Sequence, residues 1–506
     1  MFRRHQKGRP ISIFDHLRAH VREDGPGLRE GGETLPDEGT GRMWAPGAQD
    51  GVLIYHWRGS AEPAEVDRVL AAVTAATGSD QESEQEYDAL VDAVREARMI
   101  SMVDDLLDRV RESGLPPAEV YGLGHRLATE AHDREAVKLG IALLGLFSAG
   151  HHRDELMTLA RHDEFTIFAM VALANRDDEA AVEADLWALA RDVRGWGRIH
   201  LVERLASTAD PLIRDWILRE GFRNDVMNEY LAGVAARAGD LAGRLADAPD
   251  DDLLIAAADI FDALCEDGGP TQGMAGYDDG ERAAGLFLGH MADRADDLRH
   301  YFAVRSIRTY AADHWPHLEP GCAEILERPL WSDLARLGLT ATDDGEFNRA
   351  ARACRLLGVP ALRAHLSRVR RDPLAAHHWA FALKEADEDT VGEIVELAVS
   401  LLPLDEIASG PTEESGLGPG FRPHLSLDAC LPALGRWPGV GWPLVAAGLA
   451  SPAVSNRNTA IRTLAAWDGE HWPAGARDAV VRAAAREPVA EVRERLAMLL
   501  DGQPVE

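Results

Sequence analysis

The stretch from Gly195 to Leu245 most constrains the fold, because it alternates short apolar helical patterns with strong stop signals. Asp210 and Pro211 predict the start of a helix, since Asp caps free amides and Pro is tolerated in the first turn. Gly221 predicts its end, and a further helix is predicted from Val226 to Ala235. The first of these helices is expected to bury one stripe made of Leu212, Ile213, Trp216 and Ile217.

Helices this short cannot bury an apolar stripe alone, so they must pack on neighbouring helices. The chain has 506 residues, more than the roughly 250–300 residues that a single core usually holds. Long segments of alternating Val, Ile and Thr, which are typical of strands, are absent from the sequence. The sequence therefore predicts an all-α fold made of many short helices.

Internal similarity indicates a repeat array. The segments 303–315 and 457–472 share the pattern I-R-T-x-A-A, which makes Ile307 and Ile461 equivalent. Pro452 and Pro488 each precede a helical pattern and lie 36 residues apart, within the range of helix-pair repeats. The phrase EPVAEVRERLAMLL resembles the second helix of a HEAT repeat, and this resemblance is best over 444–502, with weaker matches at 130–222 and 298–312.

The HEAT resemblance implies a right-handed α-solenoid of helical hairpins, with about ten repeats at the usual period. We expect an irregular N-terminal arm at 1–60, a helical repeat array at 61–404, a flexible loop at 405–424 and HEAT-like repeats at 425–506. Within the arm, a short helix is predicted from Ile11 to Val21. The apolar run VLIYHW (52–57) is expected to be a lone strand or an extended plug, either as ordered structure or as a lid over a groove.

Charge and cysteine content restrict the partners and the compartment. The net charge of −32 repels nucleic acid and anionic membranes in bulk. The four cysteines are far apart and form no C-x-x-C pair, which argues against a zinc or disulfide framework. The basic N-terminus lacks the apolar core of a signal peptide. We therefore expect a cytoplasmic protein without cofactors.

One basic segment stands out against this acidic background. Residues 349–371 carry seven arginines and no acid. The candidate binding residues of this patch are Arg349, Arg352, Arg363 and Arg370. Such a patch could hold a phosphate, an acidic peptide or a polyanion. The alternative is that these arginines pair with acids on neighbouring helices.

The segment that follows Gly195 has a second set of candidate residues. His200 and Glu203 are i, i+3 neighbours on a helix, as general acid–base pairs can be, although no nucleophile is near them in sequence. Trp196, Arg198 and Arg204 are candidate binding residues, with Trp196 either a stacking surface or the filling of a helix corner.

A weaker candidate is a metal site at His151, His152 and Glu155, since His151 and Glu155 have i, i+4 spacing. The alternative is a polar turn between two helices, and we expect no bound metal.

The segments GGETLPDE, MWAPGAQDG, GWGRIHLVERL and IRDWILREGF are similar to a family of bacterial proteins named limonene hydroxylase. That resemblance implies an oxygenase with a pocket in the groove near His200 and Glu203. The sequence has no dinucleotide-binding glycine turn, haem-thiolate loop or two-His-one-carboxylate spacing to accompany it. We expect instead a non-catalytic scaffold that binds a protein or acidic peptide partner in a concave groove, and the alternatives are this enzyme or a polyanion-binding protein.

Overall fold

The computed structural model describes residues 11–22, 25–38, 44–57, 59–77, 84–148, 150–266, 268–416, 418–467 and 469–505. These residues form 29 α-helices and several short 3-10 or π turns. Extended pairing within the described ranges is limited to two isolated bridges, Val21 with Leu28 and Glu414 with Ala453. The prediction of an all-α fold is confirmed.

The described residues divide into two compact units, one ending at Arg328 and the other beginning at Pro329. The first unit contains α1 (Ile13–His20), α2 (Ala48–His56), α3 (Pro63–Thr77), α4 (Glu84–Arg95), α5 (Met99–Glu112), α6 (Pro117–Glu130), α7 (Arg134–Leu144), α8 (Arg153–Leu159), α9 (Asp163–Ala174), α10 (Glu179–Asp192), α11 (Trp196–Leu205), α12 (Pro211–Trp216), α13 (Ala232–Ala238), α14 (Leu241–Ala246), α15 (Asp251–Leu264), α16 (Gly280–Arg294), α17 (Leu298–His314) and α18 (Glu319–Leu326).

The second unit contains α19 (Leu330–Gly338), α20 (Asp344–Leu357), α21 (Leu362–Arg371), α22 (Ala376–Glu385), α23 (Val391–Leu401), α24 (Leu404–Ile407), α25 (Arg422–Leu434), α26 (Trp442–Leu449), α27 (Val454–Ala466), α28 (Ala476–Arg486) and α29 (Ala490–Leu500). Its core includes three fully buried indoles, those of Trp331, Trp379 and Trp467.

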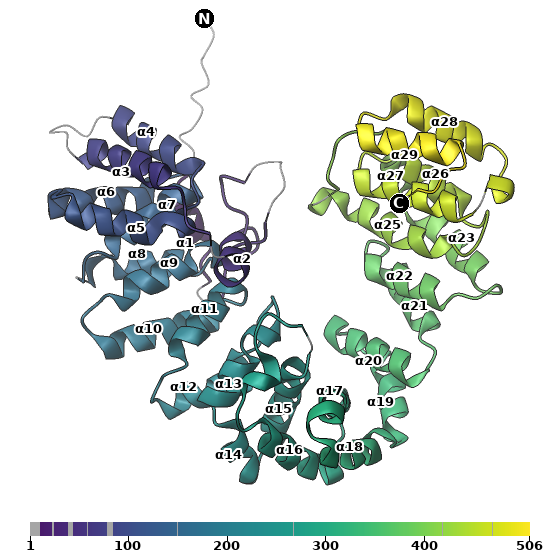
Figure 1. The fold of residues 1–506 in the computed structure, drawn as a ribbon, viewed down its shortest axis with the longest axis horizontal. Coiled ribbons are helices and arrows are strands. Elements are labelled where there is room, and N and C mark those ends of the chain that lie inside the picture. The colour runs from purple at the N-terminus through teal and green to yellow at the C-terminus, as the bar shows by residue number, and fades with distance from the viewer. Residues whose placement is uncertain are drawn as a thin grey trace, which may run out of the picture. The chain divides into compact units, whose positions relative to one another are not determined.

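Helices pack mainly on those that are next, or next but one, along the chain (Figure 1). In the first unit α6 packs on α7, α7 on α9, and α9 on α11. In the second unit α25 packs on α27, and α27 on α29. The equivalent residues Ile307 and Ile461 are both fully buried, in α17 and α27. This local packing is consistent with helical repeats.

The N-terminal segment departs from this pattern of packing. Helix α1 lies against α6 and α8, and α2 lies against α5. The run VLIYHW, expected to be extended, instead belongs to α2 up to His56, so that prediction is wrong. A six-residue apolar run does not distinguish a strand from a helix by periodicity. Helix α2 does lie against distant helices, as a plug would.

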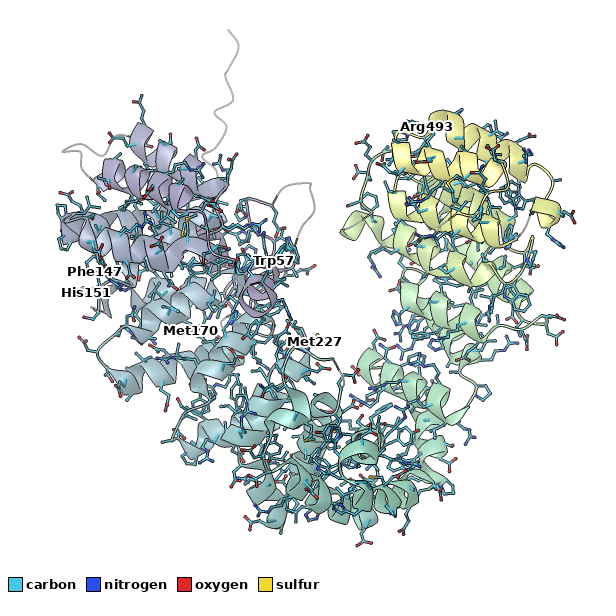
Figure 2. All side chains as sticks on the ribbon, in the orientation of Figure 1. Trp57, Phe147, His151, Met170, Met227 and Arg493 are labelled. Atoms are coloured by element: carbon cyan, nitrogen blue, oxygen red, sulfur yellow. The ribbon has the colours of Figure 1, made fainter. Side chains whose placement is uncertain are left out.

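Two local predictions in the opening stretch are also wrong. Leu212, which is expected in the buried stripe, is 67% exposed, whereas Ile213 and Ile217 of the same stripe are buried. The helix predicted from Val226 begins only at Ala232, after a 3-10 turn at Asn228–Tyr230. Met227 is consequently on the surface (Figure 2). The side chain of Asn224 accepts hydrogen bonds from the N–H groups of Val226 and Met227, which stabilises a turn in place of a helix.

The segment 405–424, expected to be a flexible loop, contains the end of α24 and the start of α25. Between them, the N–H of Gly410 donates to the carbonyl of Ala450 at 2.8 Å, and the carbonyl of Glu414 accepts from Val454 at 3.0 Å. Residues 410–414 therefore run beside the start of α27. Among the described residues, no helix is long and apolar enough to cross a membrane.

Candidate functional site

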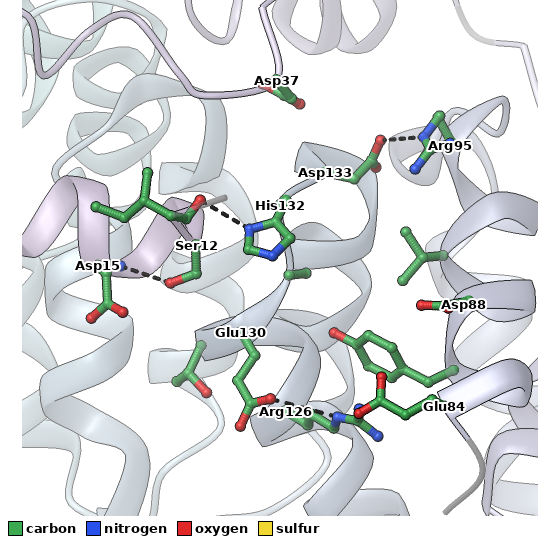
Figure 3. Close-up of a pocket in the computed structure, with 15 residues that line it drawn as sticks. Ser12, Asp15, Asp37, Glu84, Asp88, Arg95, Arg126, Glu130, His132 and Asp133 are labelled. Carbon is green, nitrogen blue, oxygen red and sulfur yellow. Dashed lines mark hydrogen bonds and ion pairs between the residues drawn. The ribbon is translucent and has the colours of Figure 1, made fainter. Parts of the chain in front are cut away.

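In the first unit, a cavity with a volume of about 1000 Å³ lies between α1, α4 and α6 (Figure 3). The segment before α1, helix α4, helix α6 and the turn into α7 supply its lining. Six carboxylate side chains and two arginines line it: Asp15, Asp37, Glu84, Asp88, Glu130 and Asp133, with Arg95 and Arg126. We call this cavity the acidic pocket.

Both arginines of the acidic pocket are held by its own acids. Arg126 lies 3.5 Å from Glu84 and 3.6 Å from Glu130, and its guanidinium stacks on the Tyr87 ring at 3.9 Å. Arg95 pairs with Asp133 at 3.2 Å. The hydroxyl of Tyr87 is buried beside this pocket, and burial raises the pKa of Tyr87 to about 12. Asp15 and Asp37 also pair with arginines outside the lining, Arg18 and Arg134. The six carboxylates still outnumber these four arginines, so the pocket favours a positively charged ligand.

The pocket also depends on the N-terminal segment. His132 Nδ1 lies 2.9 Å from the carbonyl oxygen of Ile11, a contact seen in Figure 3. Asp37 forms a bidentate pair with Arg134, at 2.8 and 3.0 Å. These contacts hold residues that precede α2 against α6 and α7, and so complete one wall of the pocket.

A buried ionic cluster around Lys138 lies beneath the N-terminal segment, and no motif in the sequence indicated it. Lys138 is 1% exposed, and its ammonium lies 2.8 Å from Asp50, 2.8 Å from Glu135 and 2.7 Å from Glu164. Burial alone would lower the pKa of Lys138, but these three carboxylates outweigh it and raise that pKa. Lysine is rare in this sequence, but no local pattern around Lys138 indicated that its side chain is buried.

The residues predicted around Gly195 are mostly internal. Trp196 and His200 are 6% and 5% exposed, and both rings pack against Tyr55 of α2, with centroids 5.8 Å apart in each case. Burial lowers the pKa of His200 to about 4, so this imidazole is neutral at pH 7. The burial of Trp196 favours the second of its two alternatives, the filling of a helix corner.

Arg198 is a structural residue and not a ligand-binding one. It is 7% exposed, and its guanidinium donates to the carbonyls of Ala190, Val193 and Arg223 at 2.8–3.0 Å. It thereby satisfies the carbonyls at the C-terminal end of α10. Arg204, by contrast, is exposed.

Glu203 is exposed on α11, and its carboxylate accepts a hydrogen bond from the hydroxyl of Tyr55 at 2.5 Å. Desolvation by the surrounding atoms raises the pKa of Glu203. The ring of His200 also faces that of Tyr55. Both side chains therefore contact α2 through Tyr55.

The predicted metal ligands do not converge. His151 is exposed (Figure 2), while His152 is fully buried with its ring 5.9 Å from that of Tyr121. Burial lowers the pKa of His152. Glu155 lies 3.9 Å from His125. Within the described ranges, no group of three or more His, Cys, Asp or Glu side chains could hold a metal ion.

In the second unit, part of the arginine patch is neutralised by acids. Arg363 and Arg370 both pair with Glu393, at 2.7 and 3.5 Å. Arg368 is buried and pairs with Asp344, which Arg371 also approaches at 3.3 Å. The alternative that these arginines pair with acids on neighbouring helices is correct at these four positions.

Arg352 lies on α20. It lines a second, smaller cavity of about 220 Å³ between α20, α21 and α22, together with Arg355, His365 and Phe381. Arg349, three residues earlier on α20, is half-buried. The basic run in the sequence thus lies on two helices, α20 and α21, and Arg352 and Arg355 of α20 line the cavity.

Comparisons with known proteins do not identify a family. No family model matches the chain, and no curated protein matches it. One solved structure, a crystal structure of an engineered protein, is similar over 87% of this chain and 98% of its own, with 17% identity and a TM-score of 0.22. A likeness at this level carries no argument about fold or function.

Proposed function

We propose that this protein is a non-catalytic binding protein that holds a basic segment of a protein partner in the acidic pocket. The observation that carries the proposal is the charge of the lining, in which six carboxylates accompany two arginines and stay in excess even when the pairs of Asp15 with Arg18 and Asp37 with Arg134 are included. A cavity of about 1000 Å³ is large enough for several side chains of an extended peptide. The proposal keeps the scaffold function expected from sequence, but replaces the acidic peptide with a basic one.

The nature of the lining supports binding over catalysis. The two arginines are engaged by Glu84, Glu130 and Asp133, and the one histidine, His132, contacts the backbone of Ile11. Lys and Arg side chains of a partner would meet exposed carboxylates on α4 and α6. Such charges accelerate association and select the sign of the partner.

A peptide titration tests this function with the full-length protein. The probe is a fluorescent octapeptide of alternating Arg and Ser, with a Glu and Ser octapeptide as its opposite. We expect Glu84→Lys/Asp88→Lys/Glu130→Lys to weaken binding of the Arg peptide by about tenfold or more, which is ~1.4 kcal/mol or more. All three side chains are exposed, so the substitutions should leave the fold intact.

The net charge of −32 attracts any basic peptide, so a matched control is essential. Glu388→Lys/Asp389→Lys/Glu406→Lys changes the net charge by the same amount at exposed positions of the second unit. Binding by this control should stay within about twofold of the unmodified protein at 0.15 M salt. Equal weakening in both variants, or absence of binding by the unmodified protein, would refute the proposal.

We further propose that the helices form a right-handed solenoid of HEAT-like pairs. The packing of each helix on the next and next but one supports this arrangement. A compact globule of this length would have a radius of gyration of about 23 Å. Small-angle scattering should give a clearly larger value for a solenoid, and a value near 23 Å would count against it.

We also propose a cytoplasmic location. The cysteines at 265, 322, 354 and 430 are buried, and none of these four described residues is assigned to a disulfide, which suits a reducing compartment. Fractionation of cells that produce the protein tests this location, and recovery in a secreted or membrane fraction would contradict it.

A further inference from the structure

The cavity between α20, α21 and α22 lies in the second unit and is separate from the acidic pocket. It has a volume of about 220 Å³, which is below the roughly 300–1,000 Å³ of pockets for drug-sized ligands and therefore leaves room only for a ligand of a few atoms. Its polar lining includes Asn348, Arg352, Arg355, His365 and His377, and Phe381 supplies an aromatic surface. In a protein of net charge −32, this is a local concentration of positive charge and N–H donors.

The two arginines share one face of α20. Arg352 and Arg355 have i, i+3 spacing, so their side chains leave the helix on the same side. The guanidinium of Arg355 lies over the ring of Phe381, 5.2 Å from its centroid. A cation held on an aromatic face is restrained in position, so ordering it around a ligand costs less entropy.

The inner wall of the cavity is a buried histidine. His365 is 2% exposed, and its Nδ1 lies 3.1 Å from Nδ1 of His378, so that one ring donates to the other. Burial lowers the pKa of His365 to about 4, and the ring is therefore neutral at pH 7. When its Nδ1 accepts from His378, its Nε2 carries a proton and is a donor.

One carboxylate, Glu385, also lines the cavity. Its Oε2 accepts a hydrogen bond from the backbone N–H of Ala361 at 3.1 Å. One carboxylate oxygen of Glu385 is therefore already bonded to the connection between α20 and α21. The remaining charged groups of the lining are the two arginines. His377 lies at the exposed rim.

We propose that this cavity binds a small oxyanion, with Arg352 and Arg355 pairing with its oxygens and His365 forming the inner wall. Guanidinium groups bind carboxylate and phosphate oxygens through paired N–H donors. Phosphates and dicarboxylates both present such oxygens, and these two classes of oxyanion are the candidate ligands. The site is independent of the peptide-binding function proposed above.

Calorimetric titration of the full-length protein tests the proposal. Inorganic phosphate and succinate are titrated separately at pH 7.5, with chloride used to keep the ionic strength constant. We expect saturable binding of at least one of them. Arg355→Gln should weaken that binding by about tenfold or more. Binding of phosphate alone, or of succinate alone, identifies which source the site selects.

The control is Arg363→Gln, which removes an arginine from the same basic run that pairs with Glu393 and does not line the cavity. Arg355 and Arg363 are both exposed, so neither Arg355→Gln nor Arg363→Gln should prevent folding. Arg352→Gln is a second variant that should also weaken binding. No saturable binding of either anion, or equal weakening in the Arg363→Gln protein, overturns the proposal.

Discussion

The carboxylate of Asp163, at the start of α9, lies at the N-terminus of α11 and accepts a hydrogen bond from the N–H of Gly197 at 2.6 Å. One helix thus caps its neighbour with a side chain, in the position where a local capping residue would otherwise stand. This relationship explains the Gly-Trp-Gly sequence at 195–197. A Cβ atom on Gly195 would lie 2.7 Å from Asp163 Oδ2, closer than normal packing permits.

Gly197→Ala should destabilise the first unit by about 1–3 kcal/mol, the usual cost of overpacking. The added methyl would lie 2.5 Å from Thr166 Oγ1 and 2.7 Å from Asp163 Oδ1. Urea denaturation followed by circular dichroism measures the change. The control is Gly289→Ala in α16, where nothing lies within 4 Å of the new atom, and a gain of about 0.5–1 kcal/mol is expected. Equal effects of the two substitutions would contradict the steric explanation.

Asp163 should also make stability depend on pH. Burial raises the pKa of Asp163 from 3.8 to about 7, despite the hydrogen bond from Gly197. The folded state therefore holds a proton that the unfolded state releases, and stability falls as the pH rises from about 4 to about 7. Above that range the loss is complete and the dependence levels off.

Asp163→Asn isolates this dependence, because Asn retains an acceptor but does not titrate. We expect the free energy of unfolding of the unmodified protein, relative to the Asn variant, to decrease between pH 4 and about 7. Denaturation curves at closely spaced pH values measure the difference. A difference that stays constant over this interval would show that Asp163 is already ionised in the fold.

Lys138→Met should destabilise the first unit by about 3–5 kcal/mol, because it leaves buried carboxylates without their cation. The three acids concerned are Asp50, Glu135 and Glu164, all within 2.8 Å of the ammonium. Lys384→Met, on the exposed surface of α22, should change stability by no more than about 0.5 kcal/mol. Addition of Glu164→Gln to Lys138→Met should recover part of the loss, and purely additive effects would argue against direct coupling.

Arg457→Gln should loosen residues 410–414. Arg457 and Glu487 are each about 1% exposed and form a bidentate pair at 2.8 Å. The same guanidinium donates to the carbonyl of Thr412 at 2.8 Å, so it ties this segment to the core of the second unit. Hydrogen exchange of a peptide covering 408–416 should become faster in the variant. The control Arg462→Gln should leave exchange there unchanged, and the same acceleration in both would contradict a specific tie.

Local sequence patterns predicted much of the fold because helix formation depends on nearby residues. Asp210 caps α12 through the N–H of Leu212, and Pro211 occupies its first turn, as expected. Local patterns failed where a short apolar run could serve two structures, as in the segment that became α2.

The candidate sites were harder to predict, since the residue types that bind ligands also serve as internal supports. Arg198 and His200 have the chemistry of a site, yet both are buried. The acidic pocket gave no continuous motif, because Asp15, Glu84 and Glu130 come from three separate helices. The arginine patch was visible in the sequence. The sequence did not indicate that Arg363 and Arg370 pair with Glu393 while Arg352 lines a cavity.

The sequence by itself determined the helical class, some helix starts such as that of α12, and the acidic character of the chain, because these depend on local propensity, capping and composition. Only the tertiary structure decided which charges are buried and which face a cavity. Lys138 is internal because Asp50 reaches it from α2, some ninety residues earlier in the chain. Burial and pairing are set by contacts between distant segments, and no local pattern encodes them.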